Sequence, residues 1–292
     1  MRVLNFGSLN IDNVFRVKDF VRPGETLAAA SFSRGAGGKG GNQSIALARA
    51  GVTVCHAGKI GPDGVFLRDN LQQNGVDVSL VEVSADDFTG SAMIQVTQSG
   101  ENAIILYGGA NLNISSKLVE KAFENFSAGD ILLIQNEINM LKEIMEKAFR
   151  RGMKIFFNPA PMDDSVLKLP LELVDTFIVN EIEGAMLAQS PTDVAACLRE
   201  KFTASSVLMT LGARGAVYWE KGKKEEIFVP AEKVEKVVDT TSAGDTFTGF
   251  FIAGLLKNKT PEEAMKLAAK AASFCVARPG AADSIPFLSQ IS

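Results

Sequence analysis

The sequence contains one histidine, His56, and three cysteines among its 292 residues. A single histidine gives little support to a histidine-based zinc site or catalytic triad, and the segment around it, 52–61, reads as an ordinary strand. The cysteines, Cys55, Cys197 and Cys275, are odd in number and show no C-x-x-C spacing. This pattern argues against a disulfide framework and fits a reducing compartment.

The chain also lacks an excess of positive charge and a long apolar run. Its formal net charge is -4 at pH 7, so no general attraction to nucleic acid or to an anionic membrane is expected. The apolar segment 249–256 is too short to span a bilayer, and residues 1–12 show no basic region followed by an apolar stretch. We therefore expect a cytoplasmic protein without nucleic-acid or membrane partners.

What the sequence does contain is a repeated alternation of a short apolar run, a turn and an amphipathic segment. Residues 130–135 and 154–160 read as buried strands, and 139–152 between them reads as an amphipathic helix. The segment that begins at Thr260 reads as a capped helix start, with Glu263 completing a capping box. Alternation over this length predicts a mostly parallel central sheet covered by helices on both faces.

Two segments break this alternation. Residues 13–34 and 88–107 each alternate apolar and polar residues around a turn, which is typical of β-hairpins. We interpret them as one small sheet that projects from the main sheet as a lid, although two separate surface hairpins would give the same pattern. Residues 1–12, 35–87 and 108–292 would then form the α/β core.

A glycine-rich stretch, RGAGGKGGNQ, occupies residues 34–43. Gly35, Gly37 and Gly40 match G-x-G-x-x-G, but a dinucleotide fingerprint should directly follow the first strand, which here ends in GSLNID. A Walker-type phosphate loop also fails, because Lys39 is followed by glycine rather than serine or threonine. Clustered glycines let a ligand approach the backbone, so the stretch suits a polar, hydroxyl-rich ligand. A plain helix-entry turn is the alternative.

Two carboxylates stand where a strand gives way to a turn or a helix. Asp12, with Asn10, follows the first strand, at the edge where open α/β sheets bind ligands, and a carboxylate can accept bonds from neighbouring hydroxyls. Asp245 lies in the segment 237–251, between an apolar strand and an apolar helix. Either carboxylate could simply cap a turn or a helix. For Asp245, a glycine-containing turn at a helix N-terminus also suits chemistry on an anion.

Six motifs, read in order along the chain, resemble the ribokinase-like (PfkB) family of sugar kinases: GSLNID, GGKGGNQ, NPAP, VNEIE, TLGARG and DTTSAGD. The resemblance runs from about residue 2 to residue 287. It implies a three-layer α/β/α sandwich with a mostly parallel central sheet and a small projecting β-sheet lid. It also implies phosphoryl transfer from ATP to a primary hydroxyl, with ribose as the favoured acceptor. A kinase of another sugar (deoxyribose, fructose) or of a nucleoside, and a non-catalytic sugar- or nucleotide-binding regulator, are the alternatives.

In this family the DTTSAGD segment carries the chemistry. Asp245 matches the base that takes the proton of the attacking sugar hydroxyl. The backbone N–H groups of the same turn would stabilise the charge on the γ-phosphoryl oxygens; its residues are Ser242, Ala243, Gly244 and Asp245.

The remaining site residues implied by the resemblance form four groups. The sugar site comprises Asn10, Ile11, Asp12, Gly38, Lys39, Gly40, Gly41, Asn42, Glu137 and Asp245. The nucleotide loop comprises Thr210, Leu211, Gly212, Ala213, Arg214 and Gly215, joined by Gly244 and Asp245. Magnesium and its waters would be ordered by Asn180 and Glu183. A monovalent cation, usually potassium, would lie near Asp239, Thr241, Cys275, Arg278, Gly280 and Ser284.

The resemblance also concerns assembly and affinity. The family's lid pairs between subunits, which implies a homodimer through the lid sheet. Ala269 stands where such kinases often carry a histidine near adenine, which puts the nucleotide affinity in doubt. Gly41 stands where alanine is more usual, which would loosen the sugar pocket.

Overall fold

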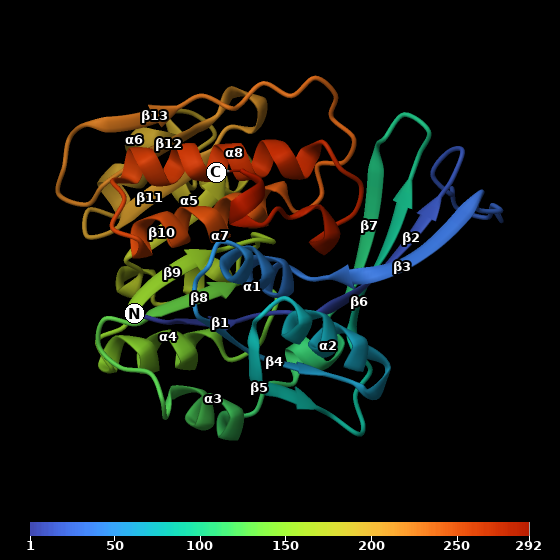
Figure 1. Ribbon diagram of the computed structural model, residues 1–292, viewed down its shortest axis with the longest axis horizontal. Coiled ribbons are helices and arrows are strands. Elements are labelled where there is room, and N and C mark those ends of the chain that lie inside the picture. Colours follow the sequence, from blue (N-terminus) through green and yellow to red (C-terminus); the bar gives the residue numbers. More distant parts are fainter. Residues whose placement is uncertain (292) are drawn as a thin grey trace.

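The computed structural model describes residues 1–291, in which one large sheet is flanked by helices (Figure 1). Within these residues the sheet has nine strands in the order β13-β12-β11-β10-β9-β8-β1-β4-β5. Neighbours from β11 to β5 run parallel, and β12 and β13 add an antiparallel edge. The strands are β1 Val3–Phe6, β4 Val54–Ile60, β5 Asp77–Val83, β8 Ile131–Gln135, β9 Lys154–Asn158, β10 Thr176–Asn180, β11 Ser206–Thr210, β12 Ala216–Trp219 and β13 Glu226–Val229.

Helices cover both faces of this sheet. One face packs against α1 Lys39–Arg49, α2 Val65–Gln73, α7 Ala243–Leu256 and α8 Pro261–Val276 in one apolar cluster. The other face packs against α3 Ser116–Phe123, α4 Leu141–Arg150, α5 Glu181–Ala188 and α6 Val194–Lys201 in a second cluster. Successive side chains of β8 alternate between the two clusters, as the pleat of a strand buried on both faces requires. The predicted three layers and mostly parallel sheet are present.

The start of α8 and the packing of α7 on α1 both follow from particular residues. Helix α8 starts with the predicted capping box, in which Thr260 and Glu263 each accept the other's backbone N–H. Helix α7 lies close to α1 because residue 249 is glycine: a Cβ there would lie 2.4 Å from Cβ of Ala46. Among the helices of residues 1–291, none combines the length and apolar character needed to cross a membrane.

A second, smaller sheet extends from the main body at the right of Figure 1. Its strand order is β3-β2-β6-β7, with β2 and β6 parallel at the centre and an antiparallel partner on each side. The strands are β2 Asn10–Arg16, β3 Ser31–Gly37, β6 Gly90–Val96 and β7 Asn102–Tyr107. The two predicted hairpins therefore join in one small sheet, whereas the division of the chain into core and lid stays a prediction.

Candidate active site

A cavity of about 200 Å³ lies at the carboxyl ends of the central parallel strands. Asn158, Asn180 and Thr210, the last residues of β9, β10 and β11, line it. Lys39 at the start of α1 and residues of the turn into α7 complete the wall. Parallel strands end at one edge of a sheet, so residues far apart in the sequence meet here.

Asp245 lies in the first turn of α7, lines this cavity and is 7% exposed. Asn42 Nδ2 donates to its Oδ2 at 3.1 Å, and Gln43 Nε2 donates to its Oδ1 at 2.9 Å. Both donors stand on α1, which the close packing at Gly249 brings against α7. The carboxylate is thus held through both oxygens.

The turn before α7 presents backbone donors. Ser242 adopts a left-handed conformation with φ 62°, which turns the chain into the helix. First-turn N–H groups have no acceptor within their own helix, so those of Gly244 and Asp245 are available. The N–H of Ala243 is engaged differently, because it donates to Thr240 O at 3.3 Å. Of the predicted anion-binding amides, that of Ala243 is therefore occupied by the turn itself.

Lys39 and Glu137 are half-buried neighbours beside Asp245. The backbone N–H of Lys39 donates to Glu137 Oε2 at 3.1 Å, and Ser8 Oγ donates to the same oxygen. Burial raises the pKa of Glu137, against the opposing effects of Ser8 and Lys39. Burial alone would lower the pKa of Lys39, but attraction to Asp245, Glu137 and Glu183 outweighs it and the net shift is upward. Lys39 therefore remains an ammonium group among carboxylates.

Asp12 and Asn10 project from the start of β2, where the small sheet leaves the core. Burial, with repulsion from Glu137 and Asp245, raises the pKa of Asp12 to about 7. Asn10 Oδ1 accepts from Asn111 Nδ2 at 2.8 Å. The Asn111 side chain also bonds to both backbone groups of Leu9, accepting from its N–H and donating to its carbonyl oxygen. The buried amide of Asn111 therefore fixes the Asn10 side chain.

The glycine-rich stretch packs more tightly than the sequence suggested. Gly38 has φ 91°, a conformation that favours glycine. A Cβ at Gly40 would lie 2.5 Å from Ser8 N, and one at Gly41 would lie 3.0 Å from a methyl carbon of Leu9. These two glycines bring α1 against the chain after β1 instead of leaving open space for a ligand.

The structure limits how Ile11 could take part in the predicted sugar site. Its side chain packs in the core at 3% exposure, because side chains alternate along β2 and Ile11 points away from the face that carries Asp12. Only the backbone of Ile11 is available to a sugar.

The TLGARG loop forms a tight turn after β11. Leu211 N–H donates to Gly215 O at 2.8 Å around the 3-10 turn Gly212–Arg214. Thr210 lines the cavity, whereas Ala213 and Arg214 are exposed beside it, and Arg214 pairs with Glu181 at the start of α5. The loop therefore offers backbone and a hydroxyl at the rim of the cavity.

Asn180 and Glu183 both line the cavity and form a capping box at the start of α5. Glu183 N–H donates to Asn180 Oδ1 at 2.8 Å, and Asn180 N–H donates to Glu183 Oε2 at 3.0 Å. Burial raises the pKa of Glu183. No cluster of three or more His, Cys, Asp or Glu side chains in residues 1–291 could hold a metal ion alone. These oxygens suit magnesium, with water and phosphate supplying its other ligands.

The residues predicted for a monovalent cation gather between the segment before α7 and the end of α8. Asp239 accepts from Thr241 N–H at 2.9 Å and from Gly280 N–H at 3.1 Å. Cys275 Sγ lies 2.9 Å from Ser284 Oγ and 3.6 Å from the carbonyl oxygen of Thr241. The carbonyl and carboxylate oxygens of this group match the donors that a hard cation prefers.

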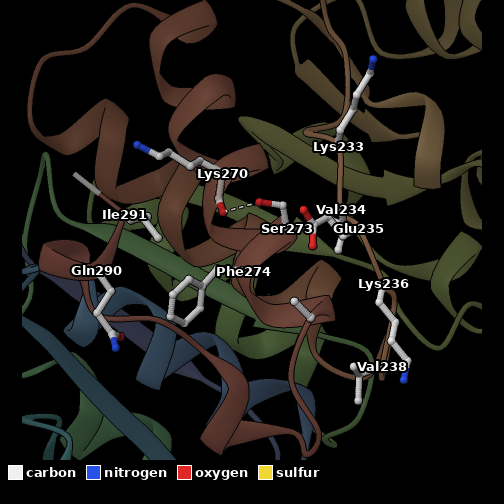
Figure 2. Close-up of a pocket in the computed structure, with 11 residues that line it drawn as sticks. Lys233, Val234, Glu235, Lys236, Val238, Lys270, Ser273, Phe274, Gln290 and Ile291 are labelled. Atoms are coloured by element: carbon white, nitrogen blue, oxygen red, sulfur yellow. Dashed lines mark hydrogen bonds between the residues drawn. The ribbon is translucent and has the colours of Figure 1, made fainter.

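A second cavity, of about 540 Å³, lies between α8 and the segment 233–238 (Figure 2). Phe274 of α8 lines it, and the Arg278 guanidinium lies 3.2 Å from the centre of that ring, so only the backbone of Arg278 could serve a cation. Along the chain, this segment leads into the turn 240–245, which lines the first cavity. Ala269 is 7% exposed and packs in the core. No motif in the sequence indicated the cavity between α8 and the segment 233–238.

Comparison with known proteins decides the family, since the family described as pfkB family carbohydrate kinase matches residues 2–288. The chain belongs to the pfkB family of carbohydrate kinases. A ribokinase of Haemophilus influenzae is 35% identical to it, over 96% of this chain and 94% of the relative.

Solved structures agree with this assignment. A ribokinase of Cryptococcus neoformans var. grubii serotype A in complex with ADP matches with a TM-score of 0.88 at 35% identity, covering 99% of this chain and 98% of that one. An Arabidopsis thaliana ribokinase complexed with ribose and ATP matches with a TM-score of 0.87 at 28% identity, covering 99% and 97%. The predicted family and the α/β fold with a small separate sheet are confirmed.

Sequence reasoning missed several residues around the site of this pfkB-family kinase. Gln43 holds Asp245, Ser8 holds Glu137, and Asn111 holds Asn10. The available signal was a polar residue at a position that the apolar pattern marks as buried. Which group each one would meet was not visible in the sequence.

Proposed function

We propose that this kinase is a ribokinase, which transfers the γ-phosphoryl group of ATP to the primary hydroxyl of D-ribose and releases D-ribose 5-phosphate and ADP. The observation that carries the proposal is Asp245, a carboxylate at the N-terminus of α7 that is held through both oxygens and lines a cavity with Lys39. The similarity to ribokinases complexed with ADP, or with ribose and ATP, supports this donor and acceptor.

Asp245 would act as the general base. Its carboxylate takes the proton of the sugar hydroxyl while that oxygen bonds to the γ-phosphorus and the bond to the bridging β–γ oxygen breaks, which leaves ADP. The N–H groups of Gly244 and Asp245 would donate to the γ-phosphoryl oxygens, with the positive end of the helix dipole behind them. Because the turn fixes these donors, they need no reorganisation as charge develops.

The sugar would lie between α1 and the start of β2. Asp12 and Glu137 would accept bonds from its hydroxyl groups, Asn10 would accept or donate, and Lys39 would donate while it offsets the carboxylate charge. Asn42 would also contact the sugar, because its bond to Asp245 uses one amide hydrogen and leaves the second N–H and the Oδ1 atom.

Asn180 and Glu183 would hold a magnesium ion through water beside the phosphates of ATP. When bound, the ion would neutralise charge on the phosphate oxygens. The group around Asp239 would hold a potassium ion, which when bound would support the turn before α7 electrostatically without touching substrate.

The small sheet would act as a lid on the sugar, formed by 13–34 and 88–107 on a core of 1–12, 35–87 and 108–292. Val14 and Ile94 share a sheet face with Asp12, so apolar side chains would cover the bound sugar. Such a lid would keep water from accepting the phosphoryl group. We also infer a homodimer formed through this sheet, and a cytoplasmic location, which the free cysteines support.

A substrate panel tests the proposal. The purified protein is given ATP and magnesium with ribose, deoxyribose, fructose or adenosine, in potassium or sodium buffer, and ADP release is measured. We expect kcat/KM to be highest for ribose and the rate to be higher in potassium. A preference for another acceptor would reassign the substrate. If none of the acceptors caused ADP release, a binding regulator would be favoured. Equal rates in both buffers would refute the proposed potassium activation and leave the proposed kinase activity in place.

The role of Asp245 is tested by Asp245→Asn, which keeps the shape and removes the proton acceptor. We expect kcat to fall by about 10²–10⁴-fold, with ribose binding retained in part when measured by calorimetry. A variant with near-parental kcat would exclude Asp245 as the base. An unfolding midpoint close to that of the parent in Asp245→Asn is the control for nonspecific disruption of the turn.

A further inference from the structure

Gln43 is one of the two side chains that bond to Asp245, and it is fully buried. The other, Asn42, stands beside it on α1. Because Gln43 has no exposed surface, it has no access to a sugar or a nucleotide in the cavity. Any effect that Gln43 has on the reaction must pass through the groups that it bonds, of which Asp245 and Asn158 line the cavity.

The amide of Gln43 can face Asp245 in one orientation only. Its Nε2 donates to Asp245 Oδ1 at 2.9 Å and to Asn158 Oδ1 at 3.1 Å, and its Oε1 accepts from Gln135 Nε2 at 2.7 Å. A flipped amide would set its oxygen against two acceptor oxygens and its nitrogen against a donor. All three bonds would then be lost in a buried setting, where unmade bonds are costly.

The neighbours of Gln43 are themselves fixed by groups that cannot flip. Asn158 Nδ2 donates to the backbone carbonyl of Ile178 at 2.8 Å, which leaves Asn158 Oδ1 to accept from Gln43. Gln135 Nε2 also donates to Asn5 Oδ1 at 3.1 Å, and Asn5 Nδ2 donates to the backbone carbonyl of Gly40 at 2.8 Å. Each amide therefore takes its direction from a main-chain acceptor.

The same buried network explains the single histidine. Asn5 Nδ2 donates to Ser44 Oγ at 2.8 Å, which leaves the Ser44 hydroxyl proton for His56 Nδ1, also at 2.8 Å. Burial lowers the pKa of His56 to about 4, so the ring is neutral and able to accept that proton. The network thus begins at a neutral ring in β4 and ends at the carboxylate of α7.

We propose that Gln43 is a positioning residue for phosphoryl transfer, whose buried and directed amide holds the Asp245 carboxylate in the orientation that receives the sugar proton. The inference rests on the proposed function. With one bond from Asn42 to Oδ2 and one from Gln43 to Oδ1, the carboxylate cannot rotate about its Cβ–Cγ bond without losing both. The lone pairs left over then keep a fixed direction toward the cavity, which is what a base needs for proton transfer.

Two matched variants test this role, Gln43→Met and Gln135→Met. Both residues are fully buried and belong to the same network, and both changes keep the volume while removing the amide, but only Gln43 touches Asp245. We expect similar losses in unfolding midpoint for the two. For Gln43→Met we expect kcat to fall by about 10–100-fold with the KM for sugar and for ATP within about threefold of the parent, and for Gln135→Met a loss of kcat at least several-fold smaller.

Equal losses of kcat in the two variants, or a Gln43→Met variant that loses affinity and keeps kcat, would show a structural role and overturn the proposal. A parent protein without sugar-dependent ADP release would instead overturn the proposed function. An arm that needs no activity separates the two cases. Crystal structures of the unliganded variants should show the Asp245 carboxylate rotated or in several orientations in Gln43→Met and in its parental orientation in Gln135→Met; a parental orientation in both would also refute the positioning role.

Discussion

At the scale of single residues, the cavity holds more negative than positive charge. Glu183 and Asp245 line it together with one ammonium group, that of Lys39, and the carboxyl groups of Asp12 and Glu137 lie close enough to interact electrostatically with Asp245. Burial is the main cause that raises the pKa of Asp12, Glu137 and Glu183, because an ionised carboxyl loses hydration there. A sugar, whose hydroxyl groups can donate to several acceptors at once, suits such a cavity better than an anionic acceptor would.

Because the pKa of Asp12 is raised, we expect sugar binding to depend on pH. With a pKa raised to about 7, this carboxyl is mostly neutral below pH 7 and mostly ionised above it. The ionised carboxylate accepts hydrogen bonds from the hydroxyl groups of the sugar. Ribose affinity should therefore fall by about tenfold from pH 8 to pH 6, as the ionised fraction of Asp12 falls from about 0.9 to about 0.1. Calorimetric titration of ribose at each pH measures this.

Asp12→Asn is the control for that pH dependence, because Glu137 and Asp245 also face this carboxyl. The variant should bind ribose weakly and with a flatter pH profile than the parent. If the ribose affinity of the parent protein did not change with pH, or strengthened toward pH 6, the proposed role of Asp12 as an acceptor would be contradicted.

At the scale of elements, the site depends on backbones that approach closely. Gly249 lets α7 reach α1, which brings Asp245 to its amide donors, and Gly37 lets β3 pass beside the Asp12 side chain. A Cβ on Gly37 would lie 2.1 Å from Asp12 Oδ2, far inside van der Waals contact. Gly37 therefore makes room for the Asp12 side chain, and Gly249 makes room for α1, rather than leaving open space for a ligand.

Gly37→Ala tests this packing. Asp12 would have to turn away from the added methyl group, so we expect the KM for ribose to rise by about tenfold or more, as expected when a charge-assisted hydrogen bond is lost, with a smaller change in kcat. Gly35→Ala on the same strand is the matched control, because a Cβ there meets nothing within 4 Å. If both variants raised KM equally, the steric explanation would be wrong.

Glu183→Gln separates two tasks of the α5 capping box. The amide oxygen of glutamine can still accept from Asn180 N–H, so the free energy of unfolding should change by less than about 0.5 kcal/mol. The magnesium concentration that gives half the maximal rate should rise by about tenfold, because the charge beside the ion is lost. Glu263→Gln, in the exposed capping box of α8, should change neither quantity. Unchanged magnesium dependence in Glu183→Gln would remove Glu183 from the metal site.

At the scale of the whole molecule, the small sheet has apolar side chains on both faces. Ile104 shares a face with Asp12 and is 51% exposed, whereas its neighbour Ile105 faces the other way with Phe15 and is 69% exposed. In the proposed lid, one of these faces would cover the sugar. So much exposed apolar surface on one projecting sheet is typical of an interface.

Ile104→Lys and Ile105→Lys test the dimer. Light scattering should give the parent the mass of two chains, and one of the two variants the mass of one chain, because a buried lysine would oppose pairing on that face only. The affected variant identifies the paired face. A parent that stays monomeric at high concentration, or two variants that both stay dimeric, would exclude a dimer through this part of the sheet.

Local pattern predicted much of this molecule. The alternation of strands and helices predicted three layers, the Thr260 capping box appears as expected, and the two hairpins form one sheet. Local pattern did not show which groups are already engaged: the Ile11 side chain packs in the core, and the N–H of Ala243 donates within its own turn, while the site roles of both residues stay predictions. A motif names a residue but does not say which way it points.

The sequence by itself determined the layers of the fold and placed Asp245 at the start of a helix, because periodicity, capping and turn chemistry act over a few neighbouring residues. Only the tertiary structure decided that Gln43, 202 positions away, would hold that carboxylate. The tertiary structure also decided that Gly37 would leave space for the Asp12 side chain. Such contacts depend on how elements far apart in the chain pack, and the direction of a buried amide is set by the acceptors that the packing places around it.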